Sequence, residues 1–360
     1  SKNKEPMKKL SLKKRKQAEQ PPSRITNETV AEHREQILAG GRKFKYPHQY
    51  ERHKLVFNAI IIILVTLVLL SIIIWWQLYP AQNTSTFFYR VTRILPVPVA
   101  SVDGAPVRYS DYLMSLSGSQ HYLEQSERLN LNSEDGKRQI EFIKRQALDG
   151  AIADTYAAKI ADEKNIKVTD EQVDQVIDAS LNTVSGRISQ DIYDDSTFST
   201  LGYTSDEYRQ IIKRALVRQE VMYSIDTKAD TTKKAAEAIL KENPVPSFAD
   251  IAKRLQDKGY AVQLGSTGLV PKSNHDGGVT QQAAKLQKNQ VSSFFRSEDG
   301  NSERNGYYIV QLVDSNDKQV NYNYLRVPLT EFDKQLKSLA VNKKIQEFIS
   351  VQKDTNAIRR

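Results

Sequence analysis

The chain has 360 residues, contains no cysteine and carries a formal net charge of +9. The missing cysteines exclude disulfide bonds and thiol catalysis, so packing alone must stabilise the fold. The charge is uneven, because residues 1–54 hold 15 Lys and Arg against 6 Asp and Glu, whereas the remaining residues hold 37 of each. The basicity therefore belongs to the N-terminal segment.

Residues 1–54 are predicted to form a mostly disordered basic tail, because their composition is too polar to bury a core. Within the tail, residues 26–39 favour a short amphipathic helix, with Thr29 and Glu32 spaced as a capping box and Gly40-Gly41 as the stop. Basic residues beside a membrane helix attract anionic lipid, and the same charge would attract the RNA of a ribosome. Both partners stay open at this point, without specific nucleic-acid recognition.

Residues 55–79, LVFNAIIIILVTLVLLSIIIWWQLY, are predicted to form a transmembrane helix. At 1.5 Å per residue they span roughly 37 Å, enough for a hydrocarbon core of about 30 Å. A buried core helix and a cleavable signal peptide are disfavoured, because the run is long, apolar on every face and preceded by 54 residues. The residues placed where an interfacial aromatic belt belongs are Trp75, Trp76 and Tyr79.

The flanks of this helix predict its orientation. The N-terminal side is the more basic, with Arg42, Lys43, Lys45, Arg52 and Lys54 against Arg90 and Arg93 on the other side. The positive-inside rule then puts the N-terminus in the cytoplasm and the bulk of the chain outside the cell membrane. Residues 80–96, flanked by proline, are expected to be a linker that stands off the membrane.

Residues 97–222 are predicted to form a mostly helical lobe. VASVDGAPVRYSDYL, residues 99–113, indicates two short strands around an Asp103-Gly104 turn, followed by a helix capped by Ser110. A helix over 138–160 follows, and two capping boxes begin further helices. The pairs that form these boxes are Thr169 with Gln172 and Thr204 with Glu207.

These motifs resemble the N-terminal domain of SurA-type chaperones. The opening hairpin is similar to that family's V-A-x-V-[ND]-G-x-P-[IV] pattern, and the stretches IADEKNIKVTDEQVDQVI and YTSDEYRQIIKRALVRQEV are similar to its later helices. The resemblance covers about 125 residues. It implies an α+β protein like the membrane-anchored SurA-, PrsA- and PpiD-like chaperones of bacteria.

In such proteins a parvulin-type peptidyl-prolyl isomerase domain usually follows, and residues 223–319 resemble one in the order of their elements. We expect a first strand at 222–226, helices in TKKAAEAILKE and SFADIAKRL, a strand around VQLGSTGLV, a helix in VTQQAAKLQ and a final hairpin ending in NGYYIVQLVD. This α/β domain is expected to be inserted into the chaperone lobe.

The residues of the isomerase site are largely missing. Active relatives carry Gly-Tyr-His in the last strand, where this chain has Gly306-Tyr307-Tyr308, and no histidine lies in residues 222–226. His275 is assigned to a loop without a catalytic role. Ser266, Val279 and Tyr308 are predicted to mark a remnant groove, and we expect no catalytic residue, metal or cofactor.

Residues 320–360 resemble the C-terminal element that returns to the first lobe in SurA- and PrsA-like chaperones. A strand in VNYNYLRVPL and a helix capped by Thr330 are expected to complete the lobe. The apolar residues that this helix is expected to carry are Phe332, Leu336, Leu339, Ile345 and Phe348. An apolar cradle for extended chains would then draw on Tyr112, Leu113, Tyr208, Ile212, Phe332 and Phe348.

Three functions stay open from the sequence. The favoured one is a non-enzymatic, membrane-anchored chaperone that binds newly exported, unfolded polypeptides near the protein translocon. The alternatives are a prolyl isomerase with a divergent site and an accessory subunit of a membrane complex such as the export machinery. Ser/His/Asp chemistry is disfavoured, because only His121 and His275 follow the apolar run.

Overall fold

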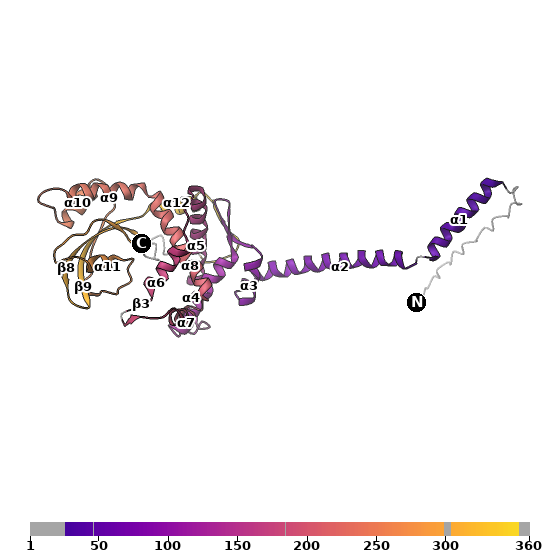
Figure 1. Ribbon diagram of the computed structural model, residues 1–360, viewed down its shortest axis with the longest axis horizontal. Coiled ribbons are helices and arrows are strands. Elements are labelled where there is room, and N and C mark those ends of the chain that lie inside the picture. Colours follow the sequence, from indigo (N-terminus) through magenta and orange to yellow (C-terminus); the bar gives the residue numbers. More distant parts are fainter. Residues whose placement is uncertain (1–25, 46, 184, 299–303, 353–360) are drawn as a thin grey trace, which may run out of the picture. The chain divides into compact units, whose positions relative to one another are not determined.

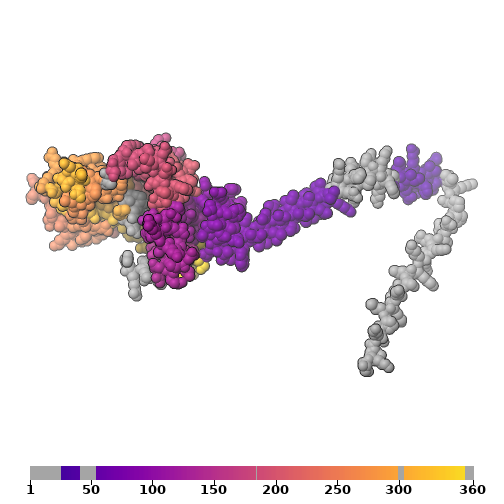
Figure 2. All heavy atoms as spheres, turned by 90° about the horizontal axis from the view of Figure 1, so that it is seen from below, coloured from indigo at the N-terminus to yellow at the C-terminus, as the bar shows by residue number. Residues whose placement is uncertain are grey.

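The computed structural model describes residues 26–45, 47–183, 185–298 and 304–352, and the side chains of residues 41–53 lie outside that description. The chain divides into two units, Ser1–Trp75 and Trp76–Arg360. Figure 1 shows helices in the first unit and both helices and sheets in the second, which confirms the α+β class. Figure 2 shows the atoms of the second unit, from purple to yellow, gathered into one body.

The first unit contains helix α1 (Asn27–Lys45) and most of α2 (Pro47–Leu78). The stretch Lys54–Leu78 contains an 18-residue window with a mean hydropathy of 3.0 and no buried residue, so by length and composition α2 can cross a membrane. The predicted helix stop at Gly40-Gly41 is wrong, because α1 continues through both glycines. A helical glycine costs only about 1 kcal/mol relative to alanine, too little to end a helix without a C-cap. Residues 1–25 of the basic tail lie outside the described residues.

Residues 80–96 differ from the predicted linker. They contain α3 (Thr86–Ile94), which buries Phe88 and Thr92 against the rest of the second unit. The buried Thr92 hydroxyl donates a hydrogen bond to the Phe88 carbonyl of the same helix at 2.9 Å. This segment is therefore a packed element of the second unit.

The helical lobe begins with the predicted hairpin and continues with the predicted helices. Its turn residues Asp103 and Gly104 have φ of 46° and 84°, the left-handed pair that a two-residue hairpin requires. Both predicted capping boxes form, whereas Ser110 does not cap, because the helix already begins at Tyr109. The elements are β1 (Pro98–Val102), β2 (Ala105–Arg108), α4 (Tyr109–Gln125), α5 (Glu134–Lys164), α6 (Asp170–Ser180), β3 (Asn182–Thr183), β4 (Gly186–Arg187), α7 (Gln190–Leu201) and α8 (Ser205–Ile225).

A second, α/β region follows α8 directly. Its elements are α9 (Thr227–Leu240), α10 (Phe248–Asp257), β5 (Gln263–Ser266), β6 (Val270–Pro271), α11 (Val279–Ala284), β7 (Phe295–Arg296), β8 (Gly306–Ser315) and β9 (Gln319–Pro328). They form an antiparallel sheet in the order β5-β9-β8-β7, with β6 also paired to β9. The described sheet thus places β9 at its centre.

Two expectations for this sheet are wrong. Residues 222–226 form no strand, because α8 continues through Ile225 and Asp226 caps the next helix. The strand expected to return to the first lobe, residues 320–329, is instead β9 in the five-stranded sheet, paired with β8 from Gly306↔Pro328 to Ser315↔Val320. The α/β region therefore lacks the strand expected at residues 222–226 and contains β9 at its C-terminal end.

The chain then returns to the helical lobe through α12 (Glu331–Val341) and β10 (Ile345–Glu347). The predicted helix was expected to carry Ile345 and Phe348, but it ends at Val341 and the following residues form a strand. β10 pairs antiparallel with β1, giving a three-stranded sheet in the order β10-β1-β2. On α12, the Phe332 ring lies 5.6 Å from that of Tyr156 on α5. The return to the first lobe therefore rests on α12 and β10.

Candidate functional site

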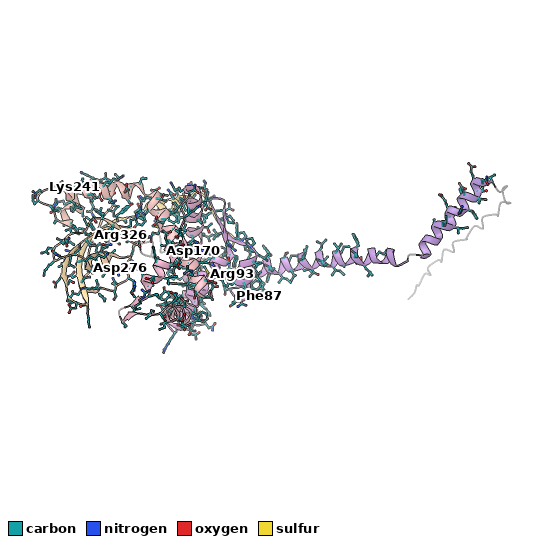
Figure 3. All side chains as sticks on the ribbon, viewed as in Figure 1. Phe87, Arg93, Asp170, Lys241, Asp276 and Arg326 are labelled. Carbon is teal, nitrogen blue, oxygen red and sulfur yellow. The ribbon has the colours of Figure 1, made fainter. Side chains whose placement is uncertain are left out.

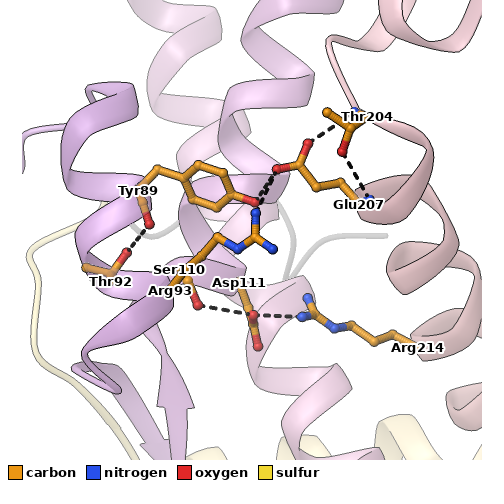
Figure 4. A network of polar contacts seen from close by, with 8 residues as sticks. All are labelled: Tyr89, Thr92, Arg93, Ser110, Asp111, Thr204, Glu207 and Arg214. Atoms are coloured by element: carbon orange, nitrogen blue, oxygen red, sulfur yellow. Dashed lines mark hydrogen bonds and ion pairs between the residues drawn. The ribbon is translucent and has the colours of Figure 1, made fainter.

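A polar network holds α3 onto the helical lobe (Figure 4). Glu207, buried near the start of α8, accepts hydrogen bonds from the Tyr89 hydroxyl at 2.7 Å and the Thr204 amide at 3.1 Å. Arg93 lies 3.6 Å from the same carboxylate. Burial alone would raise the pKa of Glu207, but the bonds from Tyr89 and Thr204 outweigh it and lower that pKa. One ionised acid therefore fixes both the start of α8 and the position of α3.

The same face of the lobe carries further ion pairs between helices. Asp111 on α4 accepts from Arg214 on α8 at 2.7 Å, and Asp154 on α5 lies 3.0 Å from Arg218 on α8. These contacts orient α4, α5 and α8 relative to one another. They are structural, because each charge is already paired with an opposite one.

A groove of about 450 Å³ opens where α4, α5 and α7 meet. Tyr203 packs over Gly118, where a Cβ atom would lie only 1.8 Å from the tyrosine oxygen, so this glycine permits the close approach of α4. Burial raises the pKa of Tyr203 to about 12, which keeps its hydroxyl neutral. The groove is lined by Gly118, Ser119, Tyr122, Leu123, Glu127, Gln139, Phe142, Ile143, Gln146, Leu201 and Tyr203.

The rim of this groove exposes large apolar side chains. Tyr122 is 39% exposed and Phe142 is 46% exposed. Helix α7 also exposes Ile192 and Phe198, which are not among the residues that line the groove. Gln139 and Gln146 add side-chain amides that can both donate to and accept from a peptide backbone. Apolar rim and amide walls together suit an extended polypeptide better than a small polar substrate. The sequence analysis did not identify this groove. Tyr122 and Phe142 each lie on a polar face of their helix, which indicates that they are exposed but not that they line one groove.

The six residues predicted to line a client cradle do not form one surface. Tyr112, Leu113, Ile212 and Phe332 are buried in the packing of the helices, and Tyr208 is half-buried against Tyr193. Phe348, 42% exposed, is the one open side chain among them. The apolar periodicity that identified these positions marks the core of the lobe, as amphipathic helices require.

The predicted remnant groove is filled. Val279 and Tyr308 belong to one buried cluster with residues of β8 and β9, while Ser266 is exposed on the strand β5. The Tyr308 ring stacks on Phe295 at 6.2 Å, and its hydroxyl donates to the Arg304 carbonyl at 2.9 Å. Tyr308 therefore packs the sheet in this structure.

A partly buried polar group that the sequence did not indicate adjoins this cluster through Tyr322. The Asp276 carboxylate accepts from the Tyr322 hydroxyl at 2.8 Å and from the Thr280 hydroxyl at 2.6 Å and amide at 2.9 Å. Burial raises the pKa of Tyr322 well above its usual range. These bonds close the loop before α11 onto β9.

Two residues join the α/β region to the helical lobe. At the end of α8, the buried Tyr223 hydroxyl donates to the Gly306 carbonyl at 2.7 Å, and Arg296 lies 4.7 Å from the ring centre. Asp226 accepts from the Ala229 amide at 2.8 Å and from the Thr330 and Glu331 amides at 2.6 and 3.0 Å. Asp226 thus caps α9 and α12 together, the helices that leave and re-enter the lobe, in place of the cap expected from Thr330.

A second cavity, of about 610 Å³, lies between α6, α8 and residues 272–281. His275 lines it together with Lys272, Glu220 and Glu298. Its walls come from both the helical lobe and the α/β region, and most of the residues that line it are polar. Among the described residues no group of three acids or histidines could hold a metal ion.

The helical lobe, its hairpin and its capped helices are matched by a known family model. Residues 51–222 match the model described as the SurA-like N-terminal domain. The chain contains a SurA-like N-terminal domain. The resemblance to SurA-, PrsA- and PpiD-like chaperones is thereby confirmed for this part of the chain.

The match of the SurA-like domain begins inside α2 and ends at Met222, so it includes the apolar stretch, α3 and the groove residues. A search of curated proteins found no relative that matches. The parvulin-like interpretation of the α/β region stays a prediction.

Proposed function

We propose that this protein is a membrane-anchored, extracytoplasmic chaperone that binds newly exported, unfolded polypeptides and catalyses no reaction. The observation that carries the proposal is the groove of the SurA-like domain, with the half-exposed side chains of Tyr122 and Phe142 at its rim. Unfolded chains expose apolar side chains and unpaired amides, and the groove offers a contact for each. The SurA-like match supports a chaperone-type family.

Membrane anchoring by α2 supports this function in a second way. A tethered binding site meets emerging chains at a high effective concentration, so modest affinity for each segment is sufficient. The partner we propose is any extended, apolar stretch of a chain leaving the translocon, and the tail would add lipid or ribosome contacts on the cytoplasmic side.

The test measures binding of a permanently unfolded, fluorescently labelled polypeptide to the full chain in lipid nanodiscs. Phe142→Ser should weaken binding about fivefold, because burying the exposed half of a phenylalanine contributes about 1 kcal/mol. Leu269→Ser is the matched control, since Leu269 is similarly exposed, at 53%, but lies in the α/β region. Equal affinity of both variants and the wild type would remove the groove from the proposal.

A photo-crosslinking amino acid at Phe142 separates the chaperone from an accessory subunit. Crosslinks to many exported proteins in cells support client binding. Crosslinks to one membrane complex alone would instead favour the structural role.

A further inference from the structure

The end of the apolar helix is part of the folded second unit. Leu78 has no exposed surface, and its carbonyl accepts from the Tyr109 hydroxyl on α4 at 2.6 Å. Tyr79, which is predicted to belong to an aromatic belt, donates to the Pro98 carbonyl at 2.6 Å. The helical lobe therefore begins at the last turn of α2. A surface of the lobe beside this turn keeps a fixed position relative to the turn.

Helix α3 follows a few residues later and has two different faces. Phe88 and Thr92 face the lobe, and Tyr89 is bonded to Glu207. On the other side Phe87 is 65% exposed and Ile94 is 83% exposed, one i,i+7 step apart on the helix. Leu95 continues this stripe. Figure 3 shows Phe87 at the end of the second unit that is remote from Lys241 and Arg326 of the α/β region.

The same helix carries exposed basic charge. Arg90 lies between the two apolar residues, is exposed, and makes no ion pair with any residue in the described part of the chain. Arg108, also exposed, donates to the Arg93 carbonyl near the end of α3 at 3.2 Å. Glu207, the acid that contacts α3, is held by Tyr89 and Arg93. Asp111 on α4 is paired with Arg214. The outer face of α3 thus combines large apolar side chains with uncompensated positive charge.

We propose that the face formed by Phe87, Arg90, Ile94 and Leu95 lies in the interfacial layer of the same membrane that α2 crosses, with Arg90 on anionic lipid phosphates. The inference rests on the proposed membrane anchoring. An apolar stripe bordered by arginine is the composition of an interfacial helix, which inserts its apolar face at the level of the headgroups. The direct continuation from α2 identifies the lipid surface as the occupant, since Leu78 is fixed to the lobe that holds α3. Docking would set the lobe, and its groove, at one orientation to the membrane.

The experiment uses the full chain, which has no cysteine, with single cysteines introduced and labelled with an environment-sensitive fluorophore. The sites are Ile94→Cys on α3, Ile63→Cys within the apolar stretch and Val341→Cys, an 82% exposed control on α12. Each protein is reconstituted in vesicles of phosphatidylglycerol and phosphatidylcholine that contain lipids with a quencher at the headgroup or deep in the acyl chains. We expect headgroup quenching at position 94, deep quenching at position 63 and none at position 341.

Adding Arg90→Gln to the Ile94→Cys protein should lower the ratio of docked to free lobe about fivefold in anionic vesicles, the effect of one basic side chain near such a surface. Pure phosphatidylcholine should have a similar effect. If position 63 is quenched but position 94 is not, α3 does not dock and the inference fails while anchoring stands. If position 63 is not quenched, the proposed anchoring fails. A spectral shift at position 94 that depends on protein concentration and not on lipid would assign the face to a second copy and also overturn the proposal.

Discussion

Glu207 shows how one side chain can serve two levels of structure. Its carboxylate completes a capping box with Thr204 and also receives the Tyr89 hydroxyl from α3. A local sequence pattern predicts the first role, because the two residues are three apart. The second role depends on an element elsewhere in the chain, and no local pattern contains it.

Glu207→Gln should destabilise the protein at neutral pH by about 1–2 kcal/mol, because hydrogen bonds to a charged acceptor become bonds to a neutral one. The pKa of Glu207 is lowered in the folded state, so its stabilisation is complete above the ordinary glutamate value of about 4.3 and is lost as pH falls through the folded pKa. Urea denaturation from pH 7 to pH 3 should show the wild-type and mutant curves converging at the acidic end. A difference independent of pH would contradict this account.

Tyr308→Phe tests whether the strand β8 of the α/β region has a chemical role. Losing the bond to the Arg304 carbonyl should lower the free energy of unfolding by about 0.5–1.5 kcal/mol, while client binding stays unchanged. The wild type should not accelerate prolyl cis/trans exchange, whose uncatalysed time is tens to hundreds of seconds. Acceleration by the wild type that disappears in the mutant would place the protein among the isomerases.

At the scale of elements, the C-terminal segment is held to the helical lobe by several independent contacts. The Phe348 amide donates to the Val99 carbonyl at 2.9 Å, and Arg145 on α5 lies 3.0 Å from Glu347. Lys344 pairs with Asp103 in the hairpin turn at 3.0 Å. Strand, ion pair and turn contacts together make β10 part of the first lobe despite its distance in sequence.

Ile349→Ala and Phe348→Ala form a matched pair of tests for this segment. Ile349 is 5% exposed, so its truncation should cost about 2–5 kcal/mol. Phe348 is 42% exposed, so its truncation should cost less than the loss expected for a buried phenylalanine. Thermal or urea unfolding of the full chain measures both, and an equal loss would mean that Phe348 is covered in solution.

The elements that were predictable share one property. The Asp103-Gly104 turn, the boxes at Thr169 and Thr204 and the apolar run of α2 are each specified within a few residues. The strand β9 was recognised as a strand but assigned to the wrong sheet, because alternation predicts a strand without naming its partner. The groove could not be predicted, since it depends on how α4, α5 and α7 meet.

At the scale of the whole molecule, the proposed orientation can be tested with the same cysteine-free background. A membrane-impermeant maleimide added to intact cells or spheroplasts should label Val341→Cys, and should label Ser11→Cys only after lysis. The basic flank of α2 predicts this result through the positive-inside rule. The opposite labelling pattern would show the reverse topology, and the proposal that exported chains are clients would then be wrong.

The position of β9 and β10 near the C-terminal end of the sequence constrains the order in which the sheets can fold. Chains are made from the N-terminus, so the partner strand of β1, residues 345–347, is made long after β1 itself. The central strand of the five-stranded sheet, residues 319–328, is also made late. Closing loops of this length is slow relative to forming helices. In the proposed topology, the protein would therefore be tethered by α2 during its export while the three-stranded and five-stranded sheets are incomplete and their apolar faces are exposed. Until its last strands arrive, it is itself the kind of chain that a chaperone binds.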